Sequence, residues 1–463
     1  MHRTLFVGLL LLASCAHAPA PVAPPLKPPA PPAAPVRESG TVSIRVERLA
    51  PGAGWSVTWR LPHPVQEVRL ARPGHGDRKR QWILATPGLS IVSVDGRDRV
   101  VSSGAPFDTF SAVVVEYARK PEKDYQAFIP FLDGTVLVYT GALAVEAPTI
   151  EEPWRVDFEL VPRKGEAVVV AGTVHAGPAR WTSRGDGTYV AFGTPPIHDT
   201  PSGMAVVDGG MPAWLRDRTL SLVPQVFALY AARTGWQLGQ RPTFFLSYGK
   251  EPDPGALSFG GGTLEGVVQV DARMGSRFAG QEDPVVWEKQ ARLVAHEAAH
   301  LWLDQQVRPS NGASPWLDEG GADAWALRAL LDLDVVTRAR FREIVSADVA
   351  ECLRLLEVGP LSGAAREGRW VAIYRCGEVA NLLTEAAGAR REPPWDVIQI
   401  WGQVFYNARE GRYDESIWFD TLLSMTGGTR VADVVHRMVE HPDPALASDI
   451  AALLQRTDAW ADR

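Results

Sequence analysis

The chain has 463 residues, of which 46% are hydrophobic and 22% are charged, a composition typical of soluble globular proteins. This length exceeds what one ordinary hydrophobic core accommodates, so we expect two or three domains. The net charge of -7 supplies no basic face to displace counterions from phosphates, which argues against DNA or RNA as a partner.

The first fifteen residues have the organisation of a secretory signal. The apolar run 5–12 follows the basic Arg3 and is far shorter than the ~20 residues of a membrane-spanning helix. The segment Leu12-Ala13-Ser14-Cys15 resembles a bacterial lipobox. We therefore expect residues 1–15 to be a lipoprotein-type signal peptide, with Cys15 lipidated and the protein anchored in the bacterial cell envelope, facing the periplasm or the exterior. An ordinary secreted protein with an incidental cysteine is the alternative.

The next two segments differ sharply in pattern. Residues 16–40 are rich in Pro and Ala, which favour extended polyproline II and predict a linker. Over residues 41–205, short segments alternate apolar and polar positions, as at Val42, Ile44 and Val46, and period two indicates half-buried strands. We expect an antiparallel, β-sandwich-like domain. It contains no cluster of His, Cys and carboxylates, so its expected role is support or substrate recognition.

Helical periodicity begins near Met211 and dominates after Pro284. Strand-like segments between these points flank the glycine-rich stretch 260–262, which lacks the G-x-G-x-x-G order of a nucleotide-binding loop. The expected organisation is an α/β domain over residues 206–392, followed by a helical region over residues 393–463.

The segment His296-Glu297-Ala298-Ala299-His300 lies in a stretch with helical periodicity. Two histidines four positions apart lie on one face of a helix, so both imidazoles can reach a single ion. Glu297, next to the first histidine, can contact a water on that ion. The pattern predicts a zinc site with an adjacent general base.

A catalytic zinc usually takes three protein ligands and leaves the fourth position to water. Glu319 follows His300 after eighteen intervening residues, near the start of a second predicted helix. It is the candidate third ligand, and a solvated acid near a helix start is the alternative. Asp323, one turn later, is placed to accept the free ring N–H of a ligating histidine. We expect one Zn2+ per chain.

The HEAAH sequence, the eighteen-residue spacing and the segment WLDEGGADAWA resemble the aminopeptidase N and leukotriene hydrolase family of gluzincin zinc metallopeptidases, with the glycyl aminopeptidases as a related family. The resemblance covers roughly residues 260–390. It implies a thermolysin-like catalytic unit in which His296, His300 and Glu319 hold zinc and Glu297 acts as general base.

Two further roles follow from this resemblance alone. The family has a catalytic tyrosine in a Y-x-K-G motif, which implies that Tyr374 stabilises the oxyanion, although Cys376 replaces the lysine. A tyrosine packed in a helix bundle is the alternative. The family's exopeptidase signature G-x-M-E-N corresponds to the segment 262–266, with Leu for Met and Gly for Asn. This implies Glu265 as a substrate-binding anchor for the amine, against a plain loop carboxylate, so aminopeptidase activity does not follow from it.

Besides Cys15, the chain contains only Cys352 and Cys376. In the oxidising compartment implied by a signal peptide they can form one disulfide, and two buried free thiols are the alternative.

The sequence therefore predicts an α+β multidomain protein with an N-terminal antiparallel β domain, a thermolysin-like catalytic unit and a C-terminal helical region. The predicted function is that of a zinc-dependent, aminopeptidase-like peptidase acting on peptides or proteins. A lipid-anchored binding or scaffold protein with an inactive gluzincin fold is the alternative, and the complete set of three ligands and a base argues against it. No G-x-S-x-G elbow occurs, so nothing supports a serine hydrolase.

Overall fold

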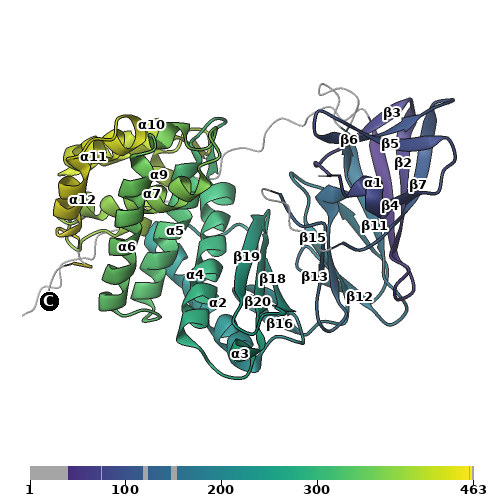
Figure 1. The fold of residues 1–463 in the computed structure, drawn as a ribbon, viewed down its shortest axis with the longest axis horizontal. Helices are drawn as coiled ribbons and strands as arrows, with labels where there is room; N and C mark the ends of the chain where they lie inside the picture. The colour runs from purple at the N-terminus through teal and green to yellow at the C-terminus, as the bar shows by residue number, and fades with distance from the viewer. Residues whose placement is uncertain (1–39, 75, 118–123, 147–153, 458, 461–463) are drawn as a thin grey trace, which may run out of the picture.

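The computed structural model describes residues 40–74, 76–117, 124–146, 154–457 and 459–460. The predicted signal peptide, Cys15 and the Pro/Ala-rich linker lie outside these residues. The described chain has an N-terminal β domain, a mixed α/β middle and a C-terminal helical part, which confirms the predicted fold class (Figure 1). No helix in the described part is long and apolar enough to cross a membrane.

The N-terminal domain is built from three sheets. Its first sheet alternates buried and more exposed side chains along β1, where Val42, Ile44 and Val46 are fully buried, as the period-two pattern predicts. In sheet order, the strands are β14 (Ala179–Thr182), β11 (Arg155–Val161), β1 (Thr41–Arg48), β2 (Trp55–Val65), β7 (Phe107–Val114) and β4 (Trp82–Leu84); then β10 (Val145–Glu146), β3 (Glu67–Leu70), β6 (Arg97–Ser102) and β5 (Leu89–Val94); then β13 (Thr173–His175), β12 (Ala167–Val170), β15 (Tyr189–Gly193), β9 (Val136–Tyr139) and β8 (Phe128–Pro130). Pairing is antiparallel apart from β1 with β11, which run parallel.

The middle of the chain forms a five-stranded sheet. Its order is β16 (Ile197–Thr200), β17 (Gly203–Val207), β18 (Thr243–Lys250), β20 (Val267–Met274) and β19 (Leu257–Leu264). Strands β17, β18 and β20 are parallel, whereas β19 is antiparallel to β20 and occupies one edge. The edge position leaves one side of β19 without a neighbouring strand in this sheet.

Helix α2 lies between β17 and β18 in the chain, the other long helices follow the sheet, and the helices pack beside it (Figure 1). Helix α4 begins at Pro284 because the Asp283 side chain accepts hydrogen bonds from two backbone N–H groups of the first turn. Proline at the first helical position has no backbone N–H and so requires no acceptor. The main helices are α2 (Ala213–Thr234), α4 (Pro284–His300), the π-helix η2 (Leu301–Gln306), α5 (Pro315–Asp332), α6 (Arg338–Leu356), α7 (Trp370–Leu383), α9 (Val397–Asn407), α10 (Glu415–Leu423), α11 (Gly428–Glu440) and α12 (Leu446–Leu454). Short elements are α1 (Arg78–Gln81), η1 (Thr140–Ala142), α3 (Ser276–Ala279), η3 (Leu361–Gly363), α8 (Glu385–Gly388), β21 (Arg308–Pro309) and β22 (Arg412–Tyr413).

The five-stranded sheet separates two hydrophobic cores. Side chains such as Phe244 and Val268 face the helices and belong to a core that continues to α12. Their neighbours Phe245 and Val267 point the other way and join the core of the β domain. Because adjacent residues of a strand face opposite sides, one sheet contributes to both cores. The β domain is therefore packed directly against the sheet that carries β19.

Candidate active site

Helices α4 and α5 bring the three predicted metal ligands together. The His296 and His300 Nε2 atoms lie 3.2 Å apart, and the Glu319 Oε2 atom lies 3.6 Å from each of them. All three side chains are buried or half-buried. The structure thus assembles the cluster that the sequence spacing predicts.

The cluster fits a zinc ion. Bonds of about 2.0–2.1 Å in a regular tetrahedron place neighbouring ligand atoms about 3.4 Å apart. The three separations here are 3.2, 3.6 and 3.6 Å. Two imidazole nitrogens and one carboxylate oxygen are also ligands that zinc prefers.

A carboxylate lies beside the Nδ1 atom of each imidazole. Asp323 Oδ1 lies 3.0 Å from Nδ1 of His296, in the position predicted from the sequence. Asp304 Oδ2, on π-helix η2, lies 2.8 Å from Nδ1 of His300. These carboxylates favour the tautomer protonated at Nδ1, which leaves the Nε2 lone pairs free to bind a metal. Asp304 was not among the predicted site residues, although its position four residues after His300 was a usable sequence signal.

Charge coupling dominates the electrostatics of the ligands. Burial by itself lowers the pKa of His296, but its interactions with Asp323 and Glu319 outweigh burial and raise the pKa to about 9. Burial alone would raise the pKa of Glu319, yet the two histidines hold it well below its usual range. The ligand carboxylate is therefore ionised.

The predicted general base, Glu297, lies between this cluster and β19. Burial raises the pKa of Glu297. The Thr263 hydroxyl lies 2.9 Å from Glu297 Oε2 and 2.8 Å from the Glu297 backbone oxygen. A Cβ at Gly261 would lie 2.6 Å from Glu297 Oε1, so the strand approaches the helix closely only because this residue is glycine. Neither Thr263 nor Gly261 was predicted to belong to the site.

Tyr374, on α7, also faces the cluster. Its ring centroid lies 6.2 Å from that of His296, and its hydroxyl interacts with the Glu319 carboxylate. Burial and this carboxylate raise the pKa of Tyr374, so the hydroxyl stays protonated and able to donate a hydrogen bond. The structure places Tyr374 beside the ligands, as the family resemblance implies.

Glu265 lies outside the cluster. It occupies the turn between β19 and β20 and lines a cavity of about 330 Å³ together with Arg180, Arg184 and Arg241. None of the three predicted metal ligands lines that cavity. The structure therefore does not bring Glu265 to the metal-ligand group.

A network of buried charged residues lies next to Asp323, the partner of His296. Arg292, one turn before His296, donates to Glu378 at 2.7 Å and lies 3.9 Å from Asp323. Arg375 and Asp348 extend the network, with a 3.3 Å ion pair between them. Burial raises the pKa of Glu378 to about 8 despite the nearby arginine. Sequence patterns give no means of pairing these residues, because they come from four different helices.

Cys352 on α6 and Cys376 on α7 form a disulfide with an S–S distance of 2.13 Å. Both residues are fully buried. The bond ties α7, which carries Tyr374, to the neighbouring helix.

Two solved structures resemble this chain. An aminopeptidase N family protein from Idiomarina loihiensis superposes with a TM-score of 0.66 and 11% sequence identity, over 89% of this chain and 78% of the other. A two-domain M1 zinc metallopeptidase, a glutamate-to-alanine mutant bound to L-arginine, aligns with a TM-score of 0.46 and 13% identity, over 88% of this chain and 94% of that one. No family model and no curated protein matches the chain. The first similarity shows that this chain has an aminopeptidase N-like, gluzincin-type fold.

Proposed function

We propose that the protein is a zinc-dependent peptidase that hydrolyses peptide bonds with a metal-activated water. The observation that carries this proposal is the cluster of His296, His300 and Glu319, whose ligand atoms are separated as zinc requires, with Glu297 next to it. The aminopeptidase N-like fold supports the same conclusion.

The chemistry assigns a role to each residue. His296, His300 and Glu319 would hold the zinc, which when bound lowers the pKa of a water from 15.7 to about 7 and polarises a carbonyl oxygen. Glu297 takes a proton from the attacking water and delivers it to the leaving amine, so that one water is consumed for each amide bond cleaved. The Tyr374 hydroxyl donates a hydrogen bond to the oxyanion that forms on the carbonyl.

The substrate class is a peptide or protein. Aminopeptidase-like specificity is supported by the fold, while Glu265, the predicted anchor for the amine, lies in a separate cavity. Anchoring in the cell envelope through a lipidated Cys15 remains a proposal that rests on the sequence alone.

Peptide cleavage tests this function. The metal-loaded chain is incubated with a peptide mixture, and products are identified by mass spectrometry before chelation, after chelation and after zinc is restored. We expect cleavage that chelation abolishes and zinc restores, and that is absent in Glu297→Gln. Glu343→Gln, on the exposed face of α6, serves as control and should cleave normally.

Two outcomes contradict the proposal. Cleavage by Glu297→Gln at the parental rate would remove the general base from the mechanism. A zinc-loaded parent that cleaves nothing in the mixture would favour the binding or scaffold alternative.

A further inference from the structure

A tyrosine of the β domain contacts the strand beside the general base. The Tyr125 hydroxyl donates a 2.7 Å hydrogen bond to the backbone oxygen of Thr263, a residue 138 positions away on β19. The hydroxyl of the same threonine lies 2.9 Å from the Glu297 carboxylate. A continuous path of contacts thus joins the β domain to the predicted base.

The direction of the Thr263 carbonyl explains how Tyr125 reaches it. Leu264 pairs with Val267 across the turn between β19 and β20, and Thr263 pairs with Val268. In an antiparallel pair, hydrogen-bonded and non-hydrogen-bonded residue pairs alternate, and a two-residue hairpin is closed by a hydrogen-bonded pair. The N–H and C=O of Thr263 therefore point away from β20, toward the open edge of the sheet where Tyr125 lies.

The β domain holds Tyr125 firmly in this position. Its ring packs against those of Tyr139 and Tyr189, with centroid distances of 5.0 and 6.3 Å. The hydroxyls of these two tyrosines are themselves bonded to backbone oxygens of Asp186 and Gln126. Burial, together with the negative charge of Glu297, raises the pKa of Tyr125, so its hydroxyl remains a donor at neutral pH. These contacts place Tyr125 between the tyrosine cluster of the β domain and β19.

The second link restrains the base itself. Glu297 is a buried carboxylate, and Thr263 is the side chain that hydrogen bonds it among the described residues. This contact engages Oε2, while Oε1 faces Gly261, where no side chain competes. The Thr263 hydroxyl has one proton and also lies 2.8 Å from the Glu297 backbone oxygen, so it spans the main chain and Oε2 of Glu297 and restrains the carboxylate against β19.

We propose that Thr263 and Tyr125 are positioning residues for the general base, with Thr263 orienting the Glu297 carboxylate and Tyr125 fixing the strand that carries Thr263. The N-terminal β domain then completes the active site. This inference rests on the proposed peptidase function. Both residues act through Glu297 and not through contact with the substrate.

The test uses the full chain, loaded with zinc, and a peptide that the parent cleaves. Thr263→Val should lower kcat by about tenfold to a hundredfold, because a misoriented base slows the chemical step, with KM and zinc content unchanged. Thr263→Ser keeps the hydroxyl and should restore kcat to within about twofold of the parent. Tyr125→Phe, which loses one neutral hydrogen bond a step further away, should lower kcat by about fivefold.

Thr243→Val is the matched control. Thr243 is a buried threonine of β18, which β20 separates from β19, and its hydroxyl has no hydrogen-bond partner among the described residues. The Thr243→Val variant should keep the parental kcat. An unchanged kcat in Thr263→Val, an effect confined to KM, or failure of Thr263→Ser to restore kcat would overturn the proposal.

Crystal structures of the parent, Thr263→Val and Thr263→Ser add a readout that does not depend on turnover. We expect the Glu297 carboxylate to leave its position in the valine variant and to keep it in the serine variant. An inactive parent would contradict the peptidase proposal, and the carboxylate positions would still decide the role of Thr263. An unmoved carboxylate in Thr263→Val would overturn that role even in an active enzyme.

Discussion

At the scale of single residues, we expect the two carboxylates beside the histidine rings to decide how tightly the proposed site binds zinc. Asp323 fixes the ring of His296, and Asp304 fixes that of His300. Such partners orient a ligand and raise its basicity, and losing one typically weakens metal binding by about tenfold to a hundredfold. The two rings are therefore held independently, from α5 and from η2.

Asp304→Asn and Asp323→Asn should each raise the Kd for zinc by about tenfold to a hundredfold, measured by competition with a chelator. An amide keeps the size of the side chain but removes the negative charge. Asp420→Asn, at an exposed position of α10, is the control and should bind zinc like the parent. Equal affinities in all four proteins would show that the carboxylates do not support the ligands.

In the proposed mechanism, Tyr374 acts on the reaction and not on metal binding. Tyr374→Phe removes only the hydroxyl, so zinc content should stay the same while kcat falls by about a hundredfold to a thousandfold, as for other oxyanion donors. Tyr406→Phe, which is 47% exposed on α9, is the matched control. Full activity in Tyr374→Phe would return this tyrosine to the role of a packing residue.

At the scale of elements, the disulfide stabilises the contact between α6 and α7. It joins residues 24 positions apart, and both are fully buried. In the chain-entropy description, closing a loop of this length stabilises the folded state by about 3 kcal/mol. The double variant Cys352→Ala/Cys376→Ala should lower the free energy of unfolding by about that amount in urea titrations. A variant as stable as the parent would indicate that the helices hold together without the bond.

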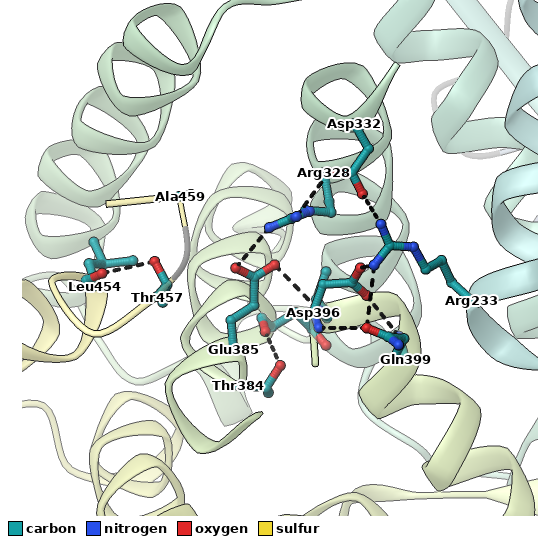
Figure 2. Close-up of polar contacts among 12 residues, drawn as sticks. Arg233, Arg328, Asp332, Thr384, Glu385, Asp396, Gln399, Leu454, Thr457 and Ala459 are labelled. Carbon is teal, nitrogen blue, oxygen red and sulfur yellow. Dashed lines mark hydrogen bonds and ion pairs between the residues drawn. The ribbon is translucent and has the colours of Figure 1, made fainter. Parts of the chain in front are cut away.

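A cluster of ion pairs connects α2, α5, α8 and the start of α9. Figure 2 shows Arg233 and Arg328 converging on acidic side chains that include Glu385 and Asp396. Burial raises the pKa of Glu385 to about 7, opposed by Arg328 and reinforced by Asp396 and Asp332. The backbone N–H of Val397 also donates to Glu385, at 3.3 Å.

This shift predicts a pH dependence of stability. In the unfolded chain Glu385 releases its proton near pH 4.5, but in the native state it keeps the proton until about pH 7. The native state binds more protons within this window, so the contribution of Glu385 to the free energy of unfolding falls as pH rises, by up to about 3 kcal/mol.

The free energy of unfolding of the parent minus that of Glu385→Gln should therefore decrease as pH is raised from about 4.5 to about 7. Urea titrations at a series of pH values measure this difference. Above the folded pKa it should level off. A difference that grows with pH would mean that the attraction of Arg328 outweighs burial.

At the scale of the whole molecule, the sequence predicted what depends on local spacing. The histidines four positions apart lie close together because an α-helix puts them on one side, and Glu319 follows on the next long helix. The β-rich first part was predicted for the same reason, from alternation along strands such as β1. These features require no knowledge of distant contacts.

Contacts between distant segments escaped prediction. The hydrogen bond from Tyr125 to Thr263 depends on how the β domain packs against the five-stranded sheet, and no periodicity encodes that packing. The location of Glu265 depends on where the turn after β19 points, which motif similarity does not determine. The pairing of Cys352 with Cys376 was open because spacing alone does not reveal the distance between two helices.

The central claim is that α4 and α5 together form a zinc site. Elemental analysis of the purified chain tests this claim most directly. We predict one equivalent of zinc in the parent and in Glu297→Gln, and a substantial loss of zinc in His296→Ala, His300→Ala and Glu319→Ala, because each of these removes one of three ligands. Folding of each variant is checked by circular dichroism. A folded parent without zinc, or ligand variants that retain a full equivalent, would contradict the account.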